Sequence, residues 1–264
     1  MEKSSTMPTA AKRALIDFGK RRREMVQHQV AARGVRSELV LEAMRKVPRE
    51  EFLPSHLQEF AYEDTPLPIA EGQTISQPYI VALMADALLL RGGERVLDIG
   101  TGSGYAAAVL AEIAGQVYSI ERIGQLAEKA AVTLAALRCD NVHVMHGDGT
   151  KGWPDHAPYD AIVVAAGGPK IPESLQLQLK AGGRLVMPVG TEIRAQELVQ
   201  VTRVSATEFR REDLADVRFV PLLGKEGWEP EAELPLQPKL RIVRPSERTL
   251  SPINRNSSRA IWID

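Results

Sequence analysis

The sequence contains a single cysteine, Cys139, among 264 residues, which excludes an intrachain disulfide. A chain without disulfides fits a reducing compartment, so a cytoplasmic location is expected. No apolar run approaches the roughly 20 residues that a membrane-spanning helix needs. Residues 1–24 lack the apolar core of a signal peptide. The sequence therefore predicts neither membrane insertion nor secretion.

The chain also lacks an excess of charge of one sign. Its 33 Lys and Arg residues balance 34 Asp and Glu residues, for a formal net charge of −1. This balance argues against a nucleic-acid partner. The five histidines show no metal-ligand spacing, so no metal is expected. A hydrophobic content of 44% is typical of a globular protein, long enough for one large domain with additions.

One glycine-rich stretch, VLDIGTGSGYAAAVLA from Val96 to Ala111, organises the chain. Its first residues are apolar and β-branched, which predicts a buried strand. Glycine then occupies every second position at Gly100, Gly102 and Gly104. The Ala-rich run from Tyr105 to Ala114 predicts a helix. A strand, a glycine turn and a helix form a nucleotide-sized pocket at the carboxyl end of the strand.

The residues of this turn are consistent with two kinds of ligand. Gly102, Gly104 and Ala107 satisfy G-x-G-x-x-A, which supports an NAD-linked oxidoreductase. Asp98 places a carboxylate at the strand tip, facing the pocket, where it suits a cationic ligand and repels a pyrophosphate. Glu121 ends the next predicted strand, where Rossmann-type folds bind ribose, and it fits either ligand.

Alternation of strands and helices predicts an α/β fold with a Rossmann-like, doubly wound sheet. Helices are expected over 25–47 in two short pieces, after Pro78, over 123–137 and over 171–180. The expected strands span 96–99, 116–122, 142–145, 159–166, 185–189, 198–204 and 217–222. No long helix separates the last of these, so the mostly parallel sheet should have an antiparallel end.

The chain divides into three predicted parts. Residues 1–24 carry an excess of Lys and Arg and form a flexible basic arm, with a weak anionic partner as the alternative. Residues 25–228 form the folded domain with N-terminal helices. Residues 229–264 are Pro-rich without a long periodic segment, which predicts an appendage that wraps the domain or stays mobile.

Residues 25–228 resemble the protein-L-isoaspartate (D-aspartate) O-methyltransferase family. The D-x-G-x-G-x-G of the central stretch resembles motif I of S-adenosylmethionine (SAM) methyltransferases, which many families share. GQTISQP, from Gly72 to Pro78, is much more specific to this family. The remaining matching stretches are VPREEFLP, VYSIER, GDG, YDAIVVAA, LKAGGRLVMPVG and FVPL.

The resemblance implies methyl transfer from SAM to the free α-carboxylate of L-isoaspartyl and D-aspartyl residues. The partners would be damaged, isoaspartyl-containing proteins and peptides, whose repair this step initiates. A carboxyl group with a pKa near ~3.5 is already ionised at neutral pH, so the reaction needs no general base. A non-catalytic SAM-binding protein is the further alternative, against which the intact GQTISQP argues.

The resemblance also implies site residues. Ser76 would be catalytic by holding the substrate carboxylate; a helix N-cap is its alternative. Glu121 would bind the ribose hydroxyls and Asp148 the adenine amino group, unless Asp148 is only a turn residue. The expected cofactor-binding set is Thr74, Ile75, Asp98, Gly100, Thr101, Gly102, Ser103, Glu121, Arg122, Asp148 and Gly149. Phe219, Val220 and Pro221 would wall the peptide groove, with an edge strand as the alternative.

Overall fold

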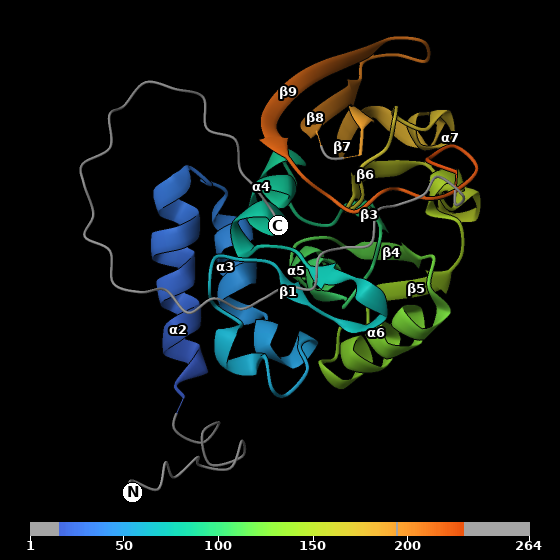
Figure 1. Cartoon of the computed structure of the whole chain (residues 1–264). Helices are drawn as coiled ribbons and strands as arrows, with labels where there is room; N and C mark the ends of the chain where they lie inside the picture. Colours follow the sequence, from blue (N-terminus) through green and yellow to red (C-terminus); the bar gives the residue numbers. More distant parts are fainter. Residues whose placement is uncertain (1–15, 194, 230–264) are drawn as a thin grey trace, which may run out of the picture.

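A seven-stranded sheet forms the centre of the molecule, with strand order β5-β4-β3-β6-β7-β8-β9 (Figure 1). The computed structural model describes residues 16–193 and 195–229. The strands of the sheet are β3 (Arg95–Ile99), β4 (Gln116–Glu121), β5 (Val142–His146), β6 (Tyr159–Val164), β7 (Leu179–Glu192), β8 (Ala195–Arg203) and β9 (Phe209–Val217). A separate pair, β1 (Leu67–Pro68) and β2 (Thr74–Ile75), is antiparallel.

The direction of the strands confirms the fold expected from the sequence. Strands β5, β4, β3, β6 and β7 run parallel to one another. Strand β8 is antiparallel to β7, and β9 is antiparallel to β8. The sheet is therefore mostly parallel with an antiparallel end.

Helices cover both faces of the sheet. They are α2 (Phe18–Met25), α3 (Glu38–Lys46), α4 (Pro78–Ala87), α5 (Tyr105–Ala111), α6 (Gly124–Ala136) and α7 (Glu173–Leu177). A π-helical turn and a 3₁₀ turn continue α2 as far as Gly34, whose left-handed backbone (φ +103°) ends the segment. Pro78 begins α4, because a missing backbone N–H costs nothing in the first helical turn.

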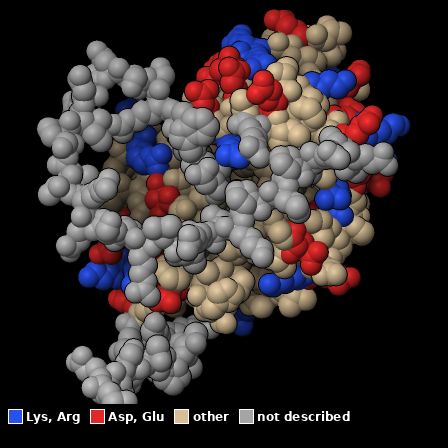
Figure 2. Space-filling view, in the orientation of Figure 1, with Lys and Arg blue, Asp and Glu red and all other residues tan. Residues whose placement is uncertain are grey.

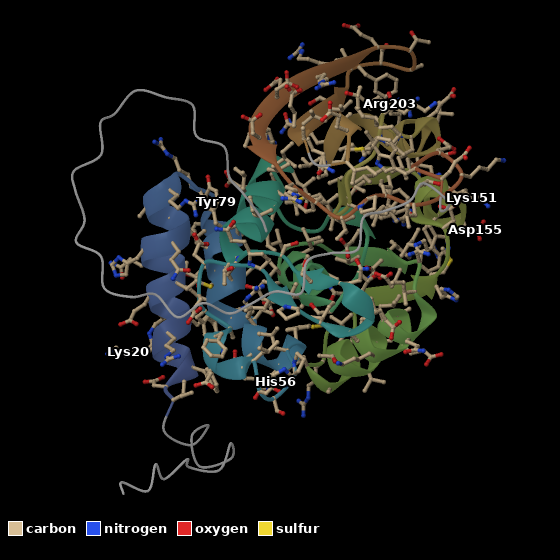
Figure 3. All side chains as sticks on the ribbon, in the orientation of Figure 1. Lys20, His56, Tyr79, Lys151, Asp155 and Arg203 are labelled. Atoms are coloured by element: carbon tan, nitrogen blue, oxygen red, sulfur yellow. The ribbon has the colours of Figure 1, made fainter. Side chains whose placement is uncertain are left out.

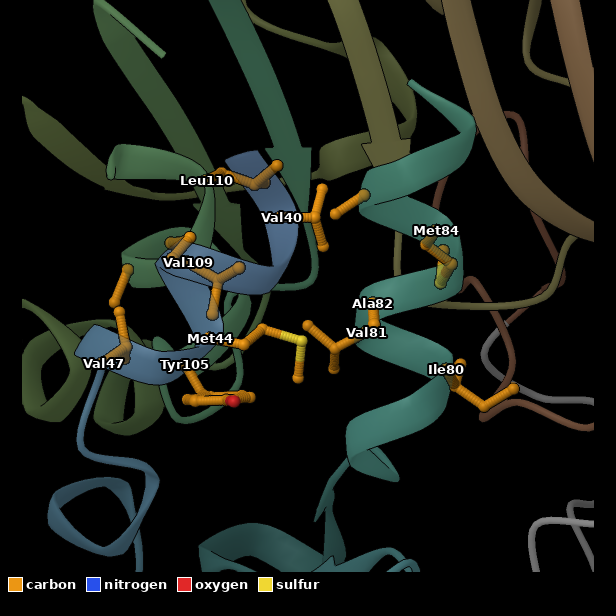
Figure 4. Close-up of a cluster of buried hydrophobic side chains, with 14 of the residues drawn as sticks. Val40, Met44, Val47, Ile80, Val81, Ala82, Met84, Tyr105, Val109 and Leu110 are labelled. Carbon is orange, nitrogen blue, oxygen red and sulfur yellow. The ribbon is translucent and has the colours of Figure 1, made fainter. Parts of the chain in front are cut away.

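The core beside the glycine-rich turn is built by three helices (Figure 4). Met44 of α3, Val81 of α4 and Tyr105 of α5 are each at most 8% exposed and pack in one cluster. A second cluster lies on the other face of the sheet and includes Leu97 and Leu175. Since each buried side chain of this size stabilises the fold by about 1.5–3 kcal/mol, these helices fix the position of the turn.

The last residues of the predicted basic arm are helical. Residues 1–15 of the predicted flexible arm lie outside the described residues, but α2 begins at Phe18. Arg22 of this helix is tied to the domain: its Nε donates to Tyr62 Oη (2.7 Å) and its Nη2 to Glu50 Oε1 (3.0 Å). The end of the predicted arm is therefore ordered, because its charge is paired inside the fold.

The helix expected over 171–180 is shorter in the structure. It is α7, and β7 begins directly after it at Leu179. Gly183 does not end a helix; a methyl group there would lie 2.9 Å from the Asp160 carbonyl oxygen, so glycine lets β7 approach β6. Arg203 of β8 closes the helix end by donating to the carbonyls of Leu177 (3.0 Å) and Leu179 (2.6 Å) (Figure 3).

The prediction of a strand over 217–222 is wrong, and the strand β9 was not predicted. Strand β9 has the sequence FRREDLADV, and most of its residues are exposed. Leu214 forms a bulge in β9. Asp213 pairs with Val199 of β8 and Ala215 pairs with Leu198, so Leu214 between them has no paired residue. The bulge breaks the alternation of apolar and polar residues, which is the only pattern that predicts a half-buried strand.

The surface of the described residues carries charges of both signs. Figure 2 shows Lys and Arg interspersed with Asp and Glu on the face in view. Among the described residues, none of the helices is long and apolar enough to cross a membrane.

Candidate functional site

Loops from four parallel strands meet at one edge of the sheet. Backbone hydrogen bonds link them: Gly100 N donates to Ile120 O (2.8 Å), Gly147 N to Glu121 O (2.9 Å) and Ala165 N to Ile99 O (2.8 Å). The edge holds the carboxyl ends of β3, β4, β5 and β6, where open α/β sheets bind ligands. The structure therefore brings the glycine-rich turn, Glu121 and the Asp148 segment together.

The glycine-rich turn needs its glycines. Gly100, Gly102 and Gly104 have φ values of +91°, +54° and +92°, a region that side chains disfavour. A methyl group on Gly102 would find its nearest neighbour at Ile69 Cδ1, 3.8 Å away. The loop that carries β1 and β2, and with it Thr74 and Ile75, therefore lies beside the turn.

The side chain of Glu121 adds to the backbone bonds that fix the turn to β4. Its side chain is only 6% exposed. Oε2 accepts a hydrogen bond from Gly102 N (2.8 Å), and Oε1 accepts one from Ile123 N (2.9 Å). Each carboxylate oxygen has two acceptor positions, so one remains on each for a pair of ribose hydroxyls. The neighbouring Arg122 has an exposed side chain, and only its carbonyl oxygen, which pairs with His146, is fixed.

The environment of Asp98 differs from the expectation, because its carboxylate does not face an open pocket. Its side chain is fully buried in β3, and Oδ2 accepts a hydrogen bond from Ser119 Oγ (2.6 Å). The Ser119 oxygen in turn lies 2.6 Å from Thr101 Oγ1. Asp98 thus reaches the glycine-rich turn through two hydroxyl groups, while Ser103 at the tip of the turn is half-buried.

The second carboxylate oxygen of Asp98 makes the site suitable for a cation. Oδ1 is buried and has no hydrogen-bond partner within the described part of the chain. Burial, with a smaller contribution from the charge of Glu121, raises the pKa of Asp98 to about 6 against the opposing hydrogen bond from Ser119. A buried, unpaired acceptor is costly, and a positive charge nearby offsets that cost. These residues fit a positively charged nucleoside such as SAM.

Asp148 serves as a turn residue in this structure. Oδ1 accepts hydrogen bonds from the backbone and hydroxyl groups of Thr150 (3.0 and 2.7 Å), and Oδ2 accepts one from Lys225 N (3.0 Å). Partial burial raises the pKa of Asp148, but the hydrogen bonds from Lys225 and Thr150 outweigh it and the pKa is lowered. One acceptor position on Oδ2 remains for an adenine amino group. Gly149 packs so closely on Ile99 that a methyl group would overlap it.

Ser76 follows β2 and precedes α4. It is half-buried, and its hydroxyl group has no hydrogen-bond partner among the described residues. The N-cap of α4 is Gln77, whose side chain makes no cap hydrogen bond and donates instead to Asp64 O (3.0 Å). The helix-cap alternative for Ser76 therefore has no support in the geometry, and its hydroxyl group is available to a ligand.

Phe219, Val220 and Pro221 do not form an edge strand. Strand β9 ends at Val217, and the chain then crosses the end of β6. There Gly167 N donates to Val220 O (2.8 Å), and Leu222 N donates to Gly167 O (2.8 Å). The segment therefore lies at the same carboxyl edge, next to the loop that follows β6. No hydrogen bond among the described residues joins it to Ser76.

Two residues of the site were not predicted. Ser119 is the one polar residue inside the apolar run VYSI of β4, and a polar residue in a buried strand signals a hydrogen-bonded partner. Arg49 is fully buried: its Nε donates to Ala61 O (2.8 Å) and its guanidinium lies 4.8 Å from the ring centroid of Tyr105. Arg49 thus supports the helix that follows the glycine-rich turn.

Comparison with known proteins identifies the family. The model of the protein-L-isoaspartate(D-aspartate) O-methyltransferase family matches residues 20–227. The chain is 64% identical over 223 residues to protein-L-isoaspartate O-methyltransferase 1 of Rhodopseudomonas palustris strain HaA2, covering 83% of this chain and 91% of that protein. It is 59% identical over 212 residues to protein-L-isoaspartate O-methyltransferase 2 of Marinobacter nauticus, covering 80% and 97%.

Solved structures agree. A protein-L-isoaspartate O-methyltransferase structure superposes with a TM-score of 0.71 at 33% identity, covering 78% of this chain and 67% of that one. A Plasmodium falciparum structure assigned to the same enzyme class, in complex with S-adenosyl-L-homocysteine, gives 0.65 at 26% identity, covering 76% and 98%. The chain belongs to the protein-L-isoaspartate(D-aspartate) O-methyltransferase family.

Proposed function

We propose that this chain transfers the methyl group of SAM to the free α-carboxylate of L-isoaspartyl and D-aspartyl residues in damaged proteins and peptides. One observation carries the proposal: the glycine-rich turn, Glu121 and Asp98 meet at the sheet edge of a chain that spans 91% of an isoaspartate methyltransferase at 64% identity. The S-adenosyl-L-homocysteine in the Plasmodium falciparum structure supports SAM as the cofactor.

Bound SAM supplies an electrophilic methyl group, and the residues of the chain hold and orient it. Glu121 would accept hydrogen bonds from the two ribose hydroxyls at the positions that Gly102 N and Ile123 N leave free. Asp148 Oδ2 would accept a hydrogen bond from the adenine amino group beside that from Lys225 N. The buried charge of Asp98 favours a cation at the turn. Thr74, Ile75, Gly100, Thr101, Ser103, Arg122 and Gly149 complete the proposed cofactor site.

Ser76 is proposed to orient the substrate. The isoaspartyl α-carboxylate is ionised at neutral pH, so no side chain has to remove a proton. What the protein contributes is a position in line with the methyl group. The hydroxyl group of Ser76, which has no partner among the described residues, would donate a hydrogen bond to one carboxylate oxygen and leave the other free to face the methyl carbon. Phe219, Val220 and Pro221 form a wall of the peptide groove and exclude water.

The test of this function is methyl transfer to a matched pair of peptides. The full chain is incubated with methyl-labelled SAM and either an isoaspartyl peptide or the same peptide with a normal aspartyl bond. We expect labelled methyl ester on the isoaspartyl peptide and none above background on its twin. Equal labelling of both, or of neither, would overturn the proposal. Binding of NAD instead of SAM in a calorimetric titration would support an oxidoreductase.

The buried carboxyl group of Asp98 predicts how SAM binding depends on pH. Its pKa is about 6 in the free protein, and a bound cation favours the ionised form. At lower pH the carboxyl group takes up a proton that must leave when SAM binds. The affinity for SAM therefore decreases as the pH is lowered. We expect the dissociation constant at pH 5 to be about tenfold that at pH 7 by calorimetry. Asp98→Asn should bind weakly at every pH, and an equally flat wild-type profile would contradict the prediction.

The domain division and the location are also proposals. The family match over residues 20–227 supports a methyltransferase domain over 25–228, with α2 of the predicted basic arm docked on it. Residues 229–264 would be an appendage without a catalytic role. The single cysteine supports a cytoplasmic location.

A further inference from the structure

The segment Phe219–Trp228, called the strap below, connects two parts of the site. Its first residues, Phe219 to Pro221, are the proposed wall of the peptide groove. Its later residues, Gly224 to Gly227, lie on the loop after β5 that contains Asp148. The strap is thus one continuous stretch of backbone between the peptide end and the adenine end of the proposed active site.

At the adenine end, the strap is bonded to Asp148 and Thr150. Lys225 N donates to Asp148 Oδ2 (3.0 Å), and Glu226 N donates to Thr150 Oγ1 (3.2 Å). The approach is close, because a methyl group on Gly224 would overlap Asp148 Oδ1. The oxygen that holds the strap is therefore the one proposed to bind the adenine amino group.

At the peptide end, the strap is bonded to the loop after β6. Gly167 pairs with Val220 and Leu222 through two backbone hydrogen bonds of 2.8 Å. Trp228 returns to the same residue, since its Nε1 donates to Gly167 O (2.9 Å). Trp228 N also donates to Leu222 O (2.8 Å), which closes the strap into a compact loop. A shift of its adenine end is consequently transmitted to Val220.

Glu226 anchors the middle of this loop. Its carboxylate accepts hydrogen bonds from the backbone N of Ser174 (3.1 Å) and from the Ser174 hydroxyl, at the start of α7. Partial burial raises the pKa of Glu226, but these hydrogen bonds outweigh it and the pKa is lowered. The anchor is thus ionised at neutral pH and bonds the strap to the first turn of α7.

We propose that Glu226 is a positioning residue that couples cofactor binding to peptide binding by holding the strap between Asp148 and Gly167. The inference rests on the proposed function, because it takes Asp148 as the adenine acceptor and Phe219 to Pro221 as the groove wall. Cofactor bound at Asp148 orders the strap, and the ordered strap presents a formed groove to the peptide. By linkage, the peptide must tighten cofactor binding by the same factor.

The experiment measures this factor directly in the full chain. S-Adenosyl-L-homocysteine, which cannot react, is titrated by calorimetry with and without a saturating isoaspartyl peptide. In the wild type we expect the peptide to tighten its binding at least about fivefold. In Glu226→Ala the factor should fall below about twofold. Ser174→Ala removes the hydroxyl donor of the same contact and should lower the factor in the same direction.

The matched control is Glu229→Ala. Glu229 carries the same charge three residues further on, is exposed, and has no partner within the described part of the chain. It should keep the wild-type factor. A purely structural role of Glu226 would lower thermal stability and leave the factor unchanged.

Two results separate the inference from the function on which it rests. Methyl transfer to the isoaspartyl peptide with a wild-type factor near one would overturn the inference and leave the function intact. The same holds if Glu226→Ala and Ser174→Ala both fold and both keep the wild-type factor. Absence of methyl transfer by the wild type would overturn both.

Discussion

Replacing Glu121 with alanine is expected to weaken SAM binding about 100-fold. Each hydrogen bond to a charged acceptor contributes about 1.5–3 kcal/mol, and a tenfold change in affinity corresponds to about 1.4 kcal/mol. The variant would lose both ribose contacts, and Gly102 N would lose its acceptor, so the turn would no longer be held in its binding conformation. Calorimetric titration of SAM measures the effect.

Two variants control for indirect effects of this change. Glu128→Ala removes the same charge from an exposed position on α6 and should leave SAM affinity unchanged. Glu121→Gln keeps one acceptor oxygen and should fall between the wild type and the alanine variant. A folded Glu121→Ala protein with wild-type affinity would remove Glu121 from the cofactor site.

Replacing Ser76 with alanine is expected to lower kcat/KM for an isoaspartyl peptide by about 10- to 100-fold. The loss of one hydrogen bond to a charged group raises the activation free energy by about 1.5–3 kcal/mol, which corresponds to this range of rates. SAM affinity should stay nearly constant, since Ser76 acts on the substrate. Stability should change little as well, because the hydroxyl group caps no helix in the structure.

Ser37→Ala provides the comparison for a true helix cap. The Ser37 side chain accepts a hydrogen bond from Val40 N (3.5 Å) at the start of α3. Its removal should reduce stability by about 0.5–2 kcal/mol and leave turnover per folded molecule intact. If Ser76→Ala behaves like Ser37→Ala, with lower stability and normal turnover, Ser76 does not orient the substrate.

Much of the fold could be predicted because its parallel strands carry strong local patterns. A fully buried strand such as β6 is a continuous apolar run, and each glycine turn or proline marks a boundary. The exceptions have physical causes. Strand β9 is held by pairing with β8 and not by its own hydrophobicity, and its bulge hides the alternation. Gly182 and Gly183 resemble a helix end in the sequence, but both lie within β7, where Gly183 lets the strand approach the backbone of β6.

The site was predictable where its residues follow strand ends. Glu121 ends β4 and Asp148 follows the end of β5, so the parallel sheet places both at its carboxyl edge. The burial of Asp98 beside Ser119 could not be predicted, because it depends on which face of β3 the side chain occupies. Nor could the bond between Lys225 and Asp148, which joins segments 77 residues apart in the sequence.

Strand β9 also determines how the open edge of the sheet meets other chains. An edge strand of nine residues presents unpaired backbone groups that attract other extended chains. Arg210, Arg211, Glu212 and Asp213 lie on this edge, and the bulge at Leu214 bends it. Charge and curvature of this kind prevent β-sheet extension between molecules. The exposed edge of the sheet is therefore protected against pairing with a strand of another molecule.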